Sequence, residues 1–392
     1  MPPPSSAEQR VRTVLDQIEQ FNPHDSIYLA VARDALASAR ASDARHAAGA
    51  RRTCLYRAAA VCQYRRRLDG AGFCRNGGPL FEWGCPMNDS IAMGKLEYPD
   101  FKWPGGARLA LSIVVNIEEG AEANIVDGDK YPEPVDELGI ALKRPVRNFS
   151  NESNYRYGIN AGAPRIFDLL ASFGMTATVT GCALALERAP EIARRIADSP
   201  HEVCSHGYRW AHQFHMEEDE ERAYIRKAVA SIQKSIGTRP LGWLSRYLTS
   251  DRTRRLLAEE GFLYTMDDYS HDRPFWDATQ SLPLVVVPYA LDTNDMKFWS
   301  DPSYAPENWL AYARQSFDWL YEEGAAAPRM MSLGVHSRII GRPGRIKYFR
   351  DFLEYAGTRP DVWIAPRLEI ARHFASVHPH HRGAATNGSI YV

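Results

Sequence analysis

The sequence has few cysteines and no long apolar run, and both absences narrow the class of protein. Six cysteines among 392 residues are too few for a disulfide scaffold, and none forms a CxxC pair, which argues against a cysteine zinc site. No stretch of about 18 uncharged apolar residues occurs, and the first six residues (MPPPSS) lack the basic start of a secretion signal. We therefore expect reduced thiols and a soluble, cytoplasmic protein without a membrane partner.

The chain also lacks a strong excess of charge of either sign. Its 47 Lys and Arg residues oppose 48 Asp and Glu residues, which gives a formal net charge of −1. Because no global field would steer the protein onto nucleic acid or anionic lipid, we expect a small molecule as its partner. The apolar content of 45% is enough to bury the core of one large catalytic domain that carries an extension.

The N-terminal part of the chain lacks lysine. No lysine precedes Lys95, whereas the same 94 residues hold 12 arginines in segments of weak periodicity. We predict that residues 1–86 form an N-terminal extension that is poorly structured or helical. One hypothesis is that this part is translated upstream sequence and that Met87 or Met93 is the biological start. A genuine helical extension is the alternative, because residues 11–21 and 26–37 carry some amphipathic spacing.

Beyond residue 98, short apolar runs of β type alternate with amphipathic stretches, which is typical of repeated βα units and a parallel sheet. Seven or eight such units favour a closed or distorted α/β barrel over an open sheet. We predict this barrel for residues 87–377 and a flexible polar tail for residues 378–392. The predicted strands are 109–115, 176–179, 202–204, 241–244, 262–266, 284–289, 330–335 and 362–364. The predicted helices are 163–173, 189–197, 217–235, 250–260, 306–323, 343–355 and 368–375.

Polar side chains follow six of these apolar runs, at the strand ends where a barrel places its active site. Any one of them could merely cap a helix or meet solvent, but together they predict a hydrolytic site on one rim. These residues are Glu118, Glu119, Ser205, His206, Ser245, Arg246, Asp267, Asp268, Asp292, Asn294, Asp295 and His336.

Glu118 and Glu119 are the most informative pair. Adjacent carboxylates at a strand end can divide labour, one activating water as general base while the other holds a metal or orients a substrate donor. Like charges so close also raise one pKa towards neutrality, which suits a base. A merely solvated acidic loop is the alternative, because Glu122 follows nearby.

Two histidines complete the expected chemistry. His206 leaves a predicted strand beside a glycine, and neutral imidazole can coordinate a metal or accept a proton. Four residues later stands Trp210, whose indole N–H cannot ligate, so we expect no metal; if one is present, Glu119 and His206 would hold it, with zinc as the possible ion. His336 follows a predicted strand and suits a general acid that protonates a departing nitrogen.

At these residues the sequence resembles the polysaccharide deacetylase-like (NodB homology) superfamily, and within it the purine-utilisation allantoinases and related cyclic-imide hydrolases. The resemblance starts at Tyr98 and covers most of the chain beyond it; residues before about Phe81 have no counterpart. The segments that carry it are 98–112 (YPDFKWPGGARLALS), 116–120 (NIEEG), 205–210 (SHGYRW), 287–296 (VPYALDTNDM) and 331–345 (MSLGVHSRIIGRPGR).

In the deacetylases an Asp-Asp pair supplies a base and a metal ligand, an HxxxH element supplies two histidine ligands, and a late histidine is the acid. Here the pair reads Glu118-Glu119, Trp210 replaces the second histidine, and His336 is the late histidine. The departure is similar to the allantoinase branch, which works without the usual zinc triad. The resemblance implies a distorted (β/α) barrel and a homotetramer or other homo-oligomer. Residues 242–248 (GWLSRYL) depart from the Gly-Trp-Tyr-Thr-Gly-Arg-type stretch of the allantoinases, so the substrate need not be allantoin.

We expect a hydrolase of non-peptide C–N bonds, with Glu118 as base, His336 as acid, and His206, Arg246 or a loop N–H stabilising the oxyanion. Two alternatives remain open: a metal-dependent N-deacetylase of amino-sugar oligosaccharides, and a non-catalytic binder of sugars or ureides. The residues expected to bind the substrate are Glu119, Trp210, Arg246, Asp268, Asp292, Asn294 and Asp295.

Overall fold

The computed structural model describes residues 101–380, apart from 136, 138, 280 and 301–303. The described residues all belong to the unit Lys95–Val392, and the fold given below is theirs. The predictions for residues 1–86 and for the tail beyond residue 380 lie outside the described residues. Within the described ranges, no helix combines the length and the apolarity that a membrane crossing requires.

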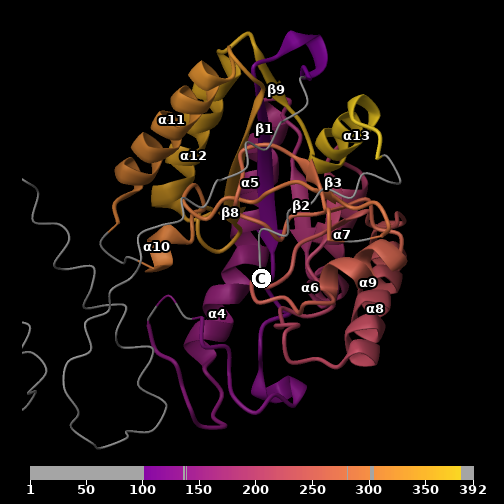
Figure 1. Ribbon diagram of the computed structural model, residues 1–392. Coiled ribbons are helices and arrows are strands. Elements are labelled where there is room, and N and C mark those ends of the chain that lie inside the picture. Colours follow the sequence, from indigo (N-terminus) through magenta and orange to yellow (C-terminus); the bar gives the residue numbers. More distant parts are fainter. Residues whose placement is uncertain (1–100, 136, 138, 280, 301–303, 381–392) are drawn as a thin grey trace, which may run out of the picture. The chain divides into compact units, whose positions relative to one another are not determined.

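A curled, nine-stranded sheet lies at the centre of the described residues (Figure 1). Its order is β6-β7-β5-β4-β3-β2-β1-β8, and β9 pairs with the first residues of β1. All pairings are parallel except that of β6 with β7. The strands are β1 (Leu109–Ile117), β2 (Thr178–Gly181), β3 (Glu202–Ser205), β4 (Gly242–Trp243), β5 (Tyr264–Thr265), β6 (Phe275–Trp276), β7 (Val285–Val286), β8 (Arg329–His336) and β9 (Val362–Ile364).

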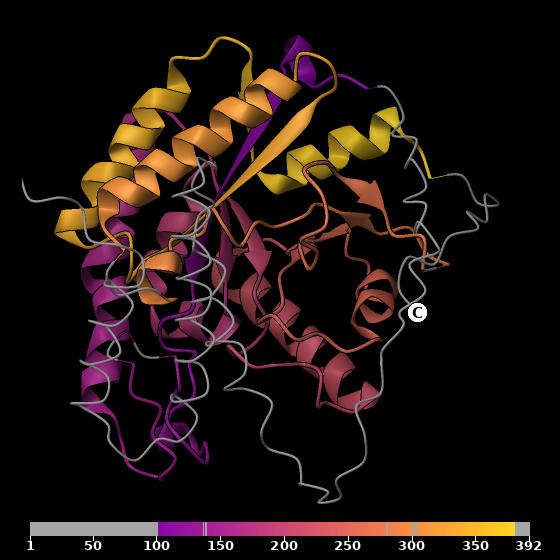
Figure 2. The same ribbon diagram turned by 60° about the vertical axis from the view of Figure 1, so that its left-hand side comes forward.

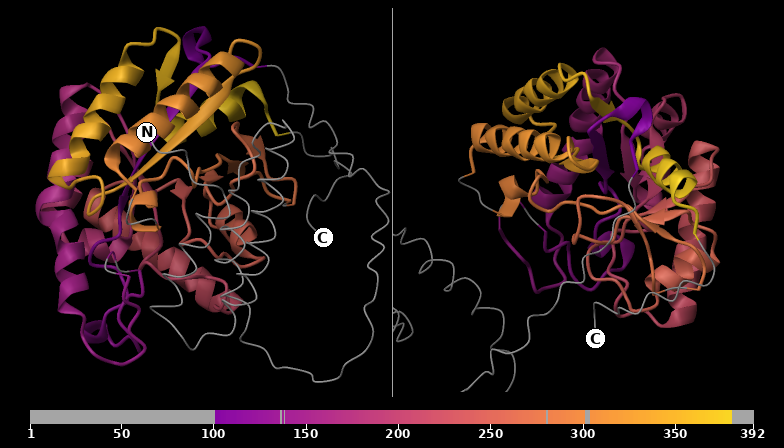
Figure 3. Two further views of the ribbon diagram at one scale, coloured as in Figure 1. Left: turned by 90° about the vertical axis from the view of Figure 1, so that its left-hand side faces the viewer. Right: turned by 45° about the horizontal axis from the view of Figure 1, so that its top comes forward.

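Helices form the outer layer around these strands (Figure 3). Figures 1 and 2 show α11 and α12 packed together on one flank, beside β8, while α8 and α9 lie on the opposite flank. The α-helices are α4 (Phe149–Tyr157), α5 (Ala163–Ser172), α6 (Ala183–Arg188), α7 (Pro190–Ala197), α8 (Glu218–Ile236), α9 (Thr253–Glu259), α10 (Lys297–Ser300), α11 (Pro306–Glu323), α12 (Pro343–Gly357) and α13 (Arg367–Val377). Single turns are η1 (Pro104–Gly106), η2 (Ile125–Asp127) and η3 (Gly158–Gly162).

Local sequence signals explain where the long helices begin and end. Helix α8 starts with a reciprocal capping box between Glu217 and Glu220, and it stops at Gly237, whose φ of 88° is readily adopted only by glycine. Helix α11 has Pro306 in its first turn, where the missing N–H costs no hydrogen bond. These signals make the bounds of α8 and α11 readable from the sequence.

Strand β1 is buried along its whole length because the sheet has two covered faces. Leu111, Ile113 and Val115 pack into the larger apolar cluster beneath the helices. Ala110 and Val114, which alternate with them, join a second cluster that contains Tyr264 and Val287 of the facing strands. The second cluster fills the inside of the curled sheet, so the strands enclose a packed core with the site at its end.

The barrel is distorted because no strand ladder in the described residues joins β8 to β6 or β7. Irregular segments bridge this gap: the N–H of Met330 donates to the carbonyl of Asp272 at 2.8 Å, and the N–H of Asp295 donates to the carbonyl of Gly334 at 3.0 Å. Inside the gap, Nη1 of the buried Arg367 donates to the carbonyls of Val287 and Pro288 at 2.5 and 2.8 Å. The predicted distorted α/β barrel is thus confirmed.

Among the elements that the sequence analysis did not predict are α4 and β6. Phe149–Tyr157 form α4, which has little apolar periodicity to reveal it. Strand β6 was not expected either, because it is two residues long and antiparallel to its neighbour. The start of the predicted tail packs against the body, since the indole of Trp276 donates to the carbonyl of His378 at 2.7 Å.

Candidate active site

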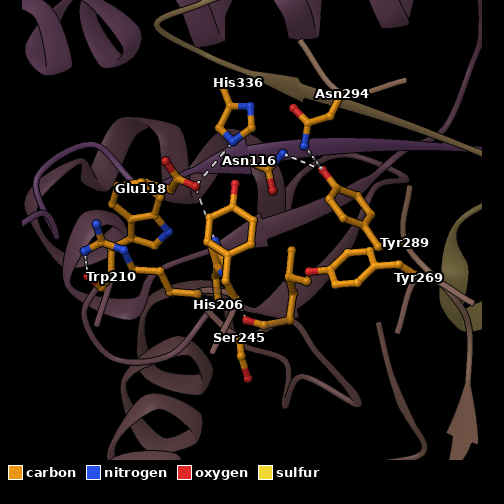
Figure 4. A pocket seen from close by; sticks show the side chains of 12 residues that line it. Asn116, Glu118, His206, Trp210, Ser245, Tyr269, Tyr289, Asn294 and His336 are labelled. Atoms are coloured by element: carbon orange, nitrogen blue, oxygen red, sulfur yellow. Dashed lines mark hydrogen bonds and ion pairs between the residues drawn. The ribbon is translucent and has the colours of Figure 1, made fainter. Parts of the chain in front are cut away.

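One pocket opens at the carboxyl ends of the strands, where the sequence predicted the site (Figure 4). Its cavity volume is about 20 Å³, room for about one water molecule, within about 280 Å³ of space that includes open solvent. Its lining residues are Asn116, Glu118, His206, Trp210, Leu244, Ser245, Arg246, Tyr247, Tyr269, Tyr289, Asn294 and His336.

Glu118 lies at the centre of this set and is 1% exposed. Its Oε1 is 3.3 Å from Nε2 of His206 and 3.4 Å from Nε2 of His336, and its Oε2 accepts from Nη1 of Arg338 at 2.8 Å. Burial by itself would raise the pKa of Glu118, but the charges of His336 and Arg338 hold that pKa well below its ordinary value. Glu118 is therefore an ionised carboxylate within the pocket at neutral pH.

His336 is fixed by Asp295, which lies behind it and is fully buried. Nδ1 of His336 donates to Oδ1 of Asp295 at 2.6 Å, while Oδ2 of the same carboxylate accepts the backbone N–H groups of His336 and Ile340. Burial would lower the pKa of His336, but the charges of Glu118 and Asp295 outweigh it and raise that pKa to about 9. At neutral pH the ring is an imidazolium whose Nε2–H faces Glu118.

His206 points its second nitrogen at the same place. Nδ1 lies 2.7 Å from the carbonyl of Leu244, and a carbonyl can only accept, so Nδ1 carries the proton. Nε2 lies 3.3 Å from Oε1 of Glu118, and because an ionised carboxylate only accepts, a hydrogen bond between the two is donated by Nε2. The three expected catalytic residues, Glu118, His206 and His336, thus converge on one pocket.

Glu119 lies behind the pocket wall, outside the lining residues. Its Oε2 accepts the backbone N–H of Glu118, and its Oε1 accepts that of Arg338, both at 3.0 Å. It packs so closely on Gly158 that a Cβ there would overlap the carboxylate. Burial raises the pKa of Glu119 to about 7, against the opposing charge of Arg338. This position supports a role in holding the loop of Arg338, and it does not support the substrate contact expected from the sequence.

Arg338 is the charged residue that the site prediction left out. It is 1% exposed, its guanidinium lies 4.3 Å from the ring centroid of Tyr155, and it reaches Glu118 across the end of the sheet. Its place two residues after His336 was the only available signal, because an arginine after a strand can equally face solvent.

Trp210 and Arg246 both reach the pocket, but they also hold each other. The Arg246 guanidinium stacks on the Trp210 ring at 3.8 Å, and its Nη1 donates to the Trp210 carbonyl at 2.7 Å. Both terminal nitrogens of Arg246 bind the buried carboxylate of Glu133 at 2.9 and 2.5 Å. Glu133 comes from a loop that gave no sequence signal. The guanidinium is thereby engaged by protein groups, so its free hydrogen-bonding capacity is small.

The other predicted substrate-binding residues divide into two groups. Asn294 lines the pocket, where its Nδ2 lies 3.1 Å from the Tyr289 hydroxyl. Asp268 and Asp292 lie outside it: Asp268 binds Arg254 and the Ser270 turn, and Asp292 is exposed and accepts from the Tyr312 hydroxyl at 2.9 Å. Asp295 is also not a lining residue, and its carboxylate is used up by His336 and its loop.

The described residues do not fit a metal of the deacetylase type. In the described part of the chain, no group of three or more His, Cys, Asp or Glu side chains could hold an ion. Both oxygens of Glu119, one of the two expected ligands, accept hydrogen bonds from backbone N–H groups. The indole of Trp210 can only donate a hydrogen bond and cannot ligate a metal. Of the two expected ligands, only His206 keeps a nitrogen directed into the pocket.

Comparison with known proteins agrees with this architecture. The family model for polysaccharide deacetylase matches residues 153–264. A Schizosaccharomyces pombe protein assigned as a polysaccharide deacetylase is 34% identical over 300 residues, which cover 71% of this chain and 93% of that protein. A solved structure from Pseudomonas aeruginosa PAO1, assigned as a polysaccharide deacetylase, has a sequence 40% identical to this chain. Its TM-score is 0.70, and the match covers 75% of this chain and 100% of that one. PuuE allantoinase is 41% identical, with a TM-score of 0.70 and coverage of 75% and 99%.

The fold is a distorted, mainly parallel α/β barrel, with the candidate site at the carboxyl ends of its strands. The chain belongs to the polysaccharide deacetylase family, which confirms the resemblance carried by its motifs. Its relatives place it among the hydrolases of carbon–nitrogen bonds other than peptide bonds.

Proposed function

We propose that the protein hydrolyses a small linear or cyclic amide, imide or ureide, with Glu118 as general base and His336 as general acid. One observation carries the proposal: an ionised carboxylate and a protonated imidazole face the same pocket 3.4 Å apart, with their pKa values shifted in opposite directions. Paired groups whose surroundings separate their pKa values in this way are suited to acid and base roles at one pH.

The attacking water has an acceptor in Glu118. Oε2 of Glu118 is engaged by Arg338 at 2.8 Å, whereas Oε1 has longer contacts of 3.3 and 3.4 Å with Nε2 of His206 and Nε2 of His336. A water that donates one hydrogen to Oε1 directs its own lone pair at the carbonyl carbon, which is the requirement for base-catalysed attack.

The leaving nitrogen takes its proton from His336. Water oxygen bonds to the carbonyl carbon, the π electrons move onto the carbonyl oxygen, and Glu118 receives the water proton. When the electron pair returns, the C–N bond breaks and Nε2–H of His336 protonates the nitrogen. The products are a carboxylic acid and an amine or amide, so atoms and charges balance. Asp295 keeps the imidazole oriented and stabilises its positive charge.

The walls of the pocket support a compact substrate with a planar polar group. Trp210, Tyr247, Tyr269 and Tyr289 surround the acid and base, and aromatic faces of this kind pack on flat ring systems. The cavity is narrow, with a volume of about 20 Å³, which favours a small heterocycle or acylated amine over several sugar rings.

The test is a hydrolysis screen of allantoin, hydantoin, succinimide, formamides and acetylated glucosamine oligomers with the purified full chain. Glu118→Gln and His336→Gln should each lower kcat by about 10²- to 10⁴-fold on the substrate found. Glu122→Gln is the matched control, because this buried carboxylate accepts the N–H of Gly120 and does not line the pocket. Normal turnover by both site variants would refute the proposal.

Metal analysis and chelation separate the alternatives. The proposed reaction continues after treatment with 1,10-phenanthroline, since no step uses a metal. Activity on acetylated glucosamine oligomers that is lost on chelation and restored by Zn²⁺ would instead establish a metal-dependent N-deacetylase. Tight binding of a ureide or sugar without turnover would establish a binding protein.

A further inference from the structure

The hydroxyl of Tyr289 lies between two buried asparagines on the pocket wall (Figure 4). Nδ2 of Asn116 and Nδ2 of Asn294 each lie 3.1 Å from this hydroxyl oxygen. Tyr289 follows β7 and lines the pocket. Its side chain is largely buried, with 6% of its surface exposed.

The backbone fixes the direction of both hydrogen bonds. Oδ1 of Asn294 accepts the N–H of Met296 at 2.9 Å, so the amide turns its Nδ2 towards Tyr289. Nδ2 of Asn116 also donates to the carbonyl of Val335 at 3.1 Å, while its Oδ1 accepts from Thr180 at 2.6 Å. Because an amide Nδ2 can only donate, the Tyr289 oxygen accepts both bonds and its own O–H remains as a donor.

This O–H finds no acceptor among the residues that the structure describes. Burial holds the pKa of Tyr289 above its ordinary value, so the hydroxyl keeps its proton. Two accepted N–H bonds also polarise the O–H and make it a stronger donor. The pocket therefore contains a buried, oriented donor that the protein leaves for a ligand.

The fold makes room for this hydroxyl at one position of β8. A Cβ on Gly334 would overlap the Tyr289 hydroxyl and crowd Nδ2 of Asn294. Gly334 lies two residues before His336 on the same strand, so the hydroxyl is held beside the general acid.

The side-chain donors that the sequence suggested for an oxyanion are engaged or inaccessible. The Arg246 terminal nitrogens bind Glu133 and the Trp210 carbonyl, and Nδ1–H of His206 donates to the Leu244 carbonyl. Nε of Arg246 has no hydrogen-bond partner in the described ranges but is fully buried, whereas Tyr289 lines the pocket.

We infer that Tyr289 is a further catalytic residue, whose O–H donates a hydrogen bond to the substrate carbonyl oxygen as that oxygen becomes negative. The inference rests on the proposed amide hydrolysis. The tyrosine gives up no proton: the bond strengthens when the π electrons reach the oxygen and weakens when the C–N bond breaks. Asn116 and Asn294 are positioning residues that act through the tyrosine.

Tyr289→Phe tests the inference by removing one oxygen atom from the pocket. On the substrate found in the screen, kcat should fall by about 10²- to 10³-fold while KM stays within about twofold, as for the loss of one oxyanion donor. The control is Tyr264→Phe, because Tyr264 is also buried and does not line the pocket. Its hydroxyl donates to Oε1 of Glu202 at 2.6 Å. If Tm falls by a similar amount in both variants but only Tyr289→Phe loses turnover, the loss of turnover reflects catalysis and not folding.

A second measurement needs no turnover. Infrared difference spectra of succinimide bound to Glu118→Gln should show a lowered carbonyl stretch, and Tyr289→Phe in the same background should reverse that lowering. Turnover of Tyr289→Phe close to that of Tyr264→Phe, or an unchanged carbonyl stretch, would overturn the role of Tyr289. The proposed hydrolysis would survive either result if Glu118→Gln and His336→Gln remain inactive. If the wild-type protein hydrolyses no amide in the screen, the proposed function fails, and the spectra still decide whether Tyr289 meets a bound carbonyl.

Discussion

The two halves of the sheet differ in how much pairing supports them. Strands β1 and β8 are joined from the Leu109–Arg329 pair to the Asn116–His336 pair, whereas β4, β5 and β7 have two residues each. The long pair ends at Glu118 and His336, which carry the proposed proton transfers. The short strands are followed by the residues of the pocket wall, such as Tyr247, Tyr269 and Tyr289.

The two halves differ in how much displacement their proposed functions tolerate. Proton transfer requires donor and acceptor within hydrogen-bond reach, so a small displacement is costly, and a continuous ladder limits such displacement. A pocket wall must instead fit a particular molecule, and loops on a rigid scaffold change shape with little cost to the fold. We therefore expect substitutions in the β1–β8 half to change kcat and its pH dependence, and substitutions in the β4–β7 half, apart from the proposed oxyanion donor Tyr289, to change KM.

The largest expected effect comes from Asp295→Asn, behind the general acid. Because Oδ2 accepts two backbone N–H groups, the amide would turn its NH₂ towards Nδ1 of His336, which would then have to accept, so the ring would lose its positive charge and become a weaker acid. We expect kcat to fall by about 10²- to 10⁴-fold. The measurement is a kcat profile against pH.

The sign of the pH effect follows from the raised pKa of His336. The acid form is present at neutral pH and is lost as the pH rises through about 9, so the wild-type profile should fall there. In Asp295→Asn this limb should move to lower pH, because one of the charges that raise the pKa is gone. Asp292→Asn, in an exposed position of the same loop, serves as control. An unshifted limb in Asp295→Asn would show that the ladder alone orients His336.

Arg338→Met should have the next largest effect, mainly on stability. Removing the buried guanidinium takes away one of the two charges that compensate the Glu118 carboxylate and leaves only His336, so we expect a loss of up to about 3 to 5 kcal/mol. The depressed pKa of Glu118 means that its stabilising contribution exists above pH 4.5 and disappears as the pH falls through the folded value. Urea denaturation at several pH values should therefore show a weaker pH dependence in this region for the variant.

Arg342→Met is the matched control for Arg338→Met. Arg342 lies in the same loop but is only partly buried, with its guanidinium 3.6 Å from the Tyr157 ring centroid, so its loss should cost about 1 kcal/mol or less. Equal losses in the two variants would mean that the Arg338–Glu118 pair contributes nothing specific.

Tyr247→Gly should have the smallest effect on folding and a selective effect on binding. Tyr247 has a left-handed φ of 49°, a conformation that costs a non-glycine residue about 1 kcal/mol, so glycine offsets the loss of packing. Loss of one aromatic contact of about 0.5 to 1.5 kcal/mol predicts a rise in KM of roughly 2- to 10-fold at nearly constant kcat. Steady-state kinetics measures KM and kcat for this variant. Leu248→Ala is the control, because Leu248 is exposed and does not line the pocket. A large fall in kcat would place Tyr247 with the reacting groups.

The accuracy of the sequence predictions follows the same division of the sheet. The predicted 109–115 strand and 306–323 helix match β1 and α11 closely, because long runs of one periodicity average out local exceptions. The predicted 262–266 and 284–289 strands shrink to two paired residues in β5 and β7, because a ladder needs a partner in register that periodicity cannot supply. Of the predicted catalytic set, Glu118, His206 and His336 meet because each directly follows or ends a parallel strand.

By itself the sequence determined the order of βα units and the strand ends at which polar side chains gather. Only the tertiary structure decided which of those side chains act. Adjacent residues of a strand point to opposite sides, so Glu118 and Glu119 had to separate, but which one faces the pocket depends on how the sheet curls. Arg338 lies 220 residues from Glu118 along the chain, and the donor direction of Tyr289 is set by backbone groups of distant segments. Such partnerships arise from folding in three dimensions, because hydrogen bonds and ion pairs act over a few ångströms and carry no trace in the local pattern of the sequence.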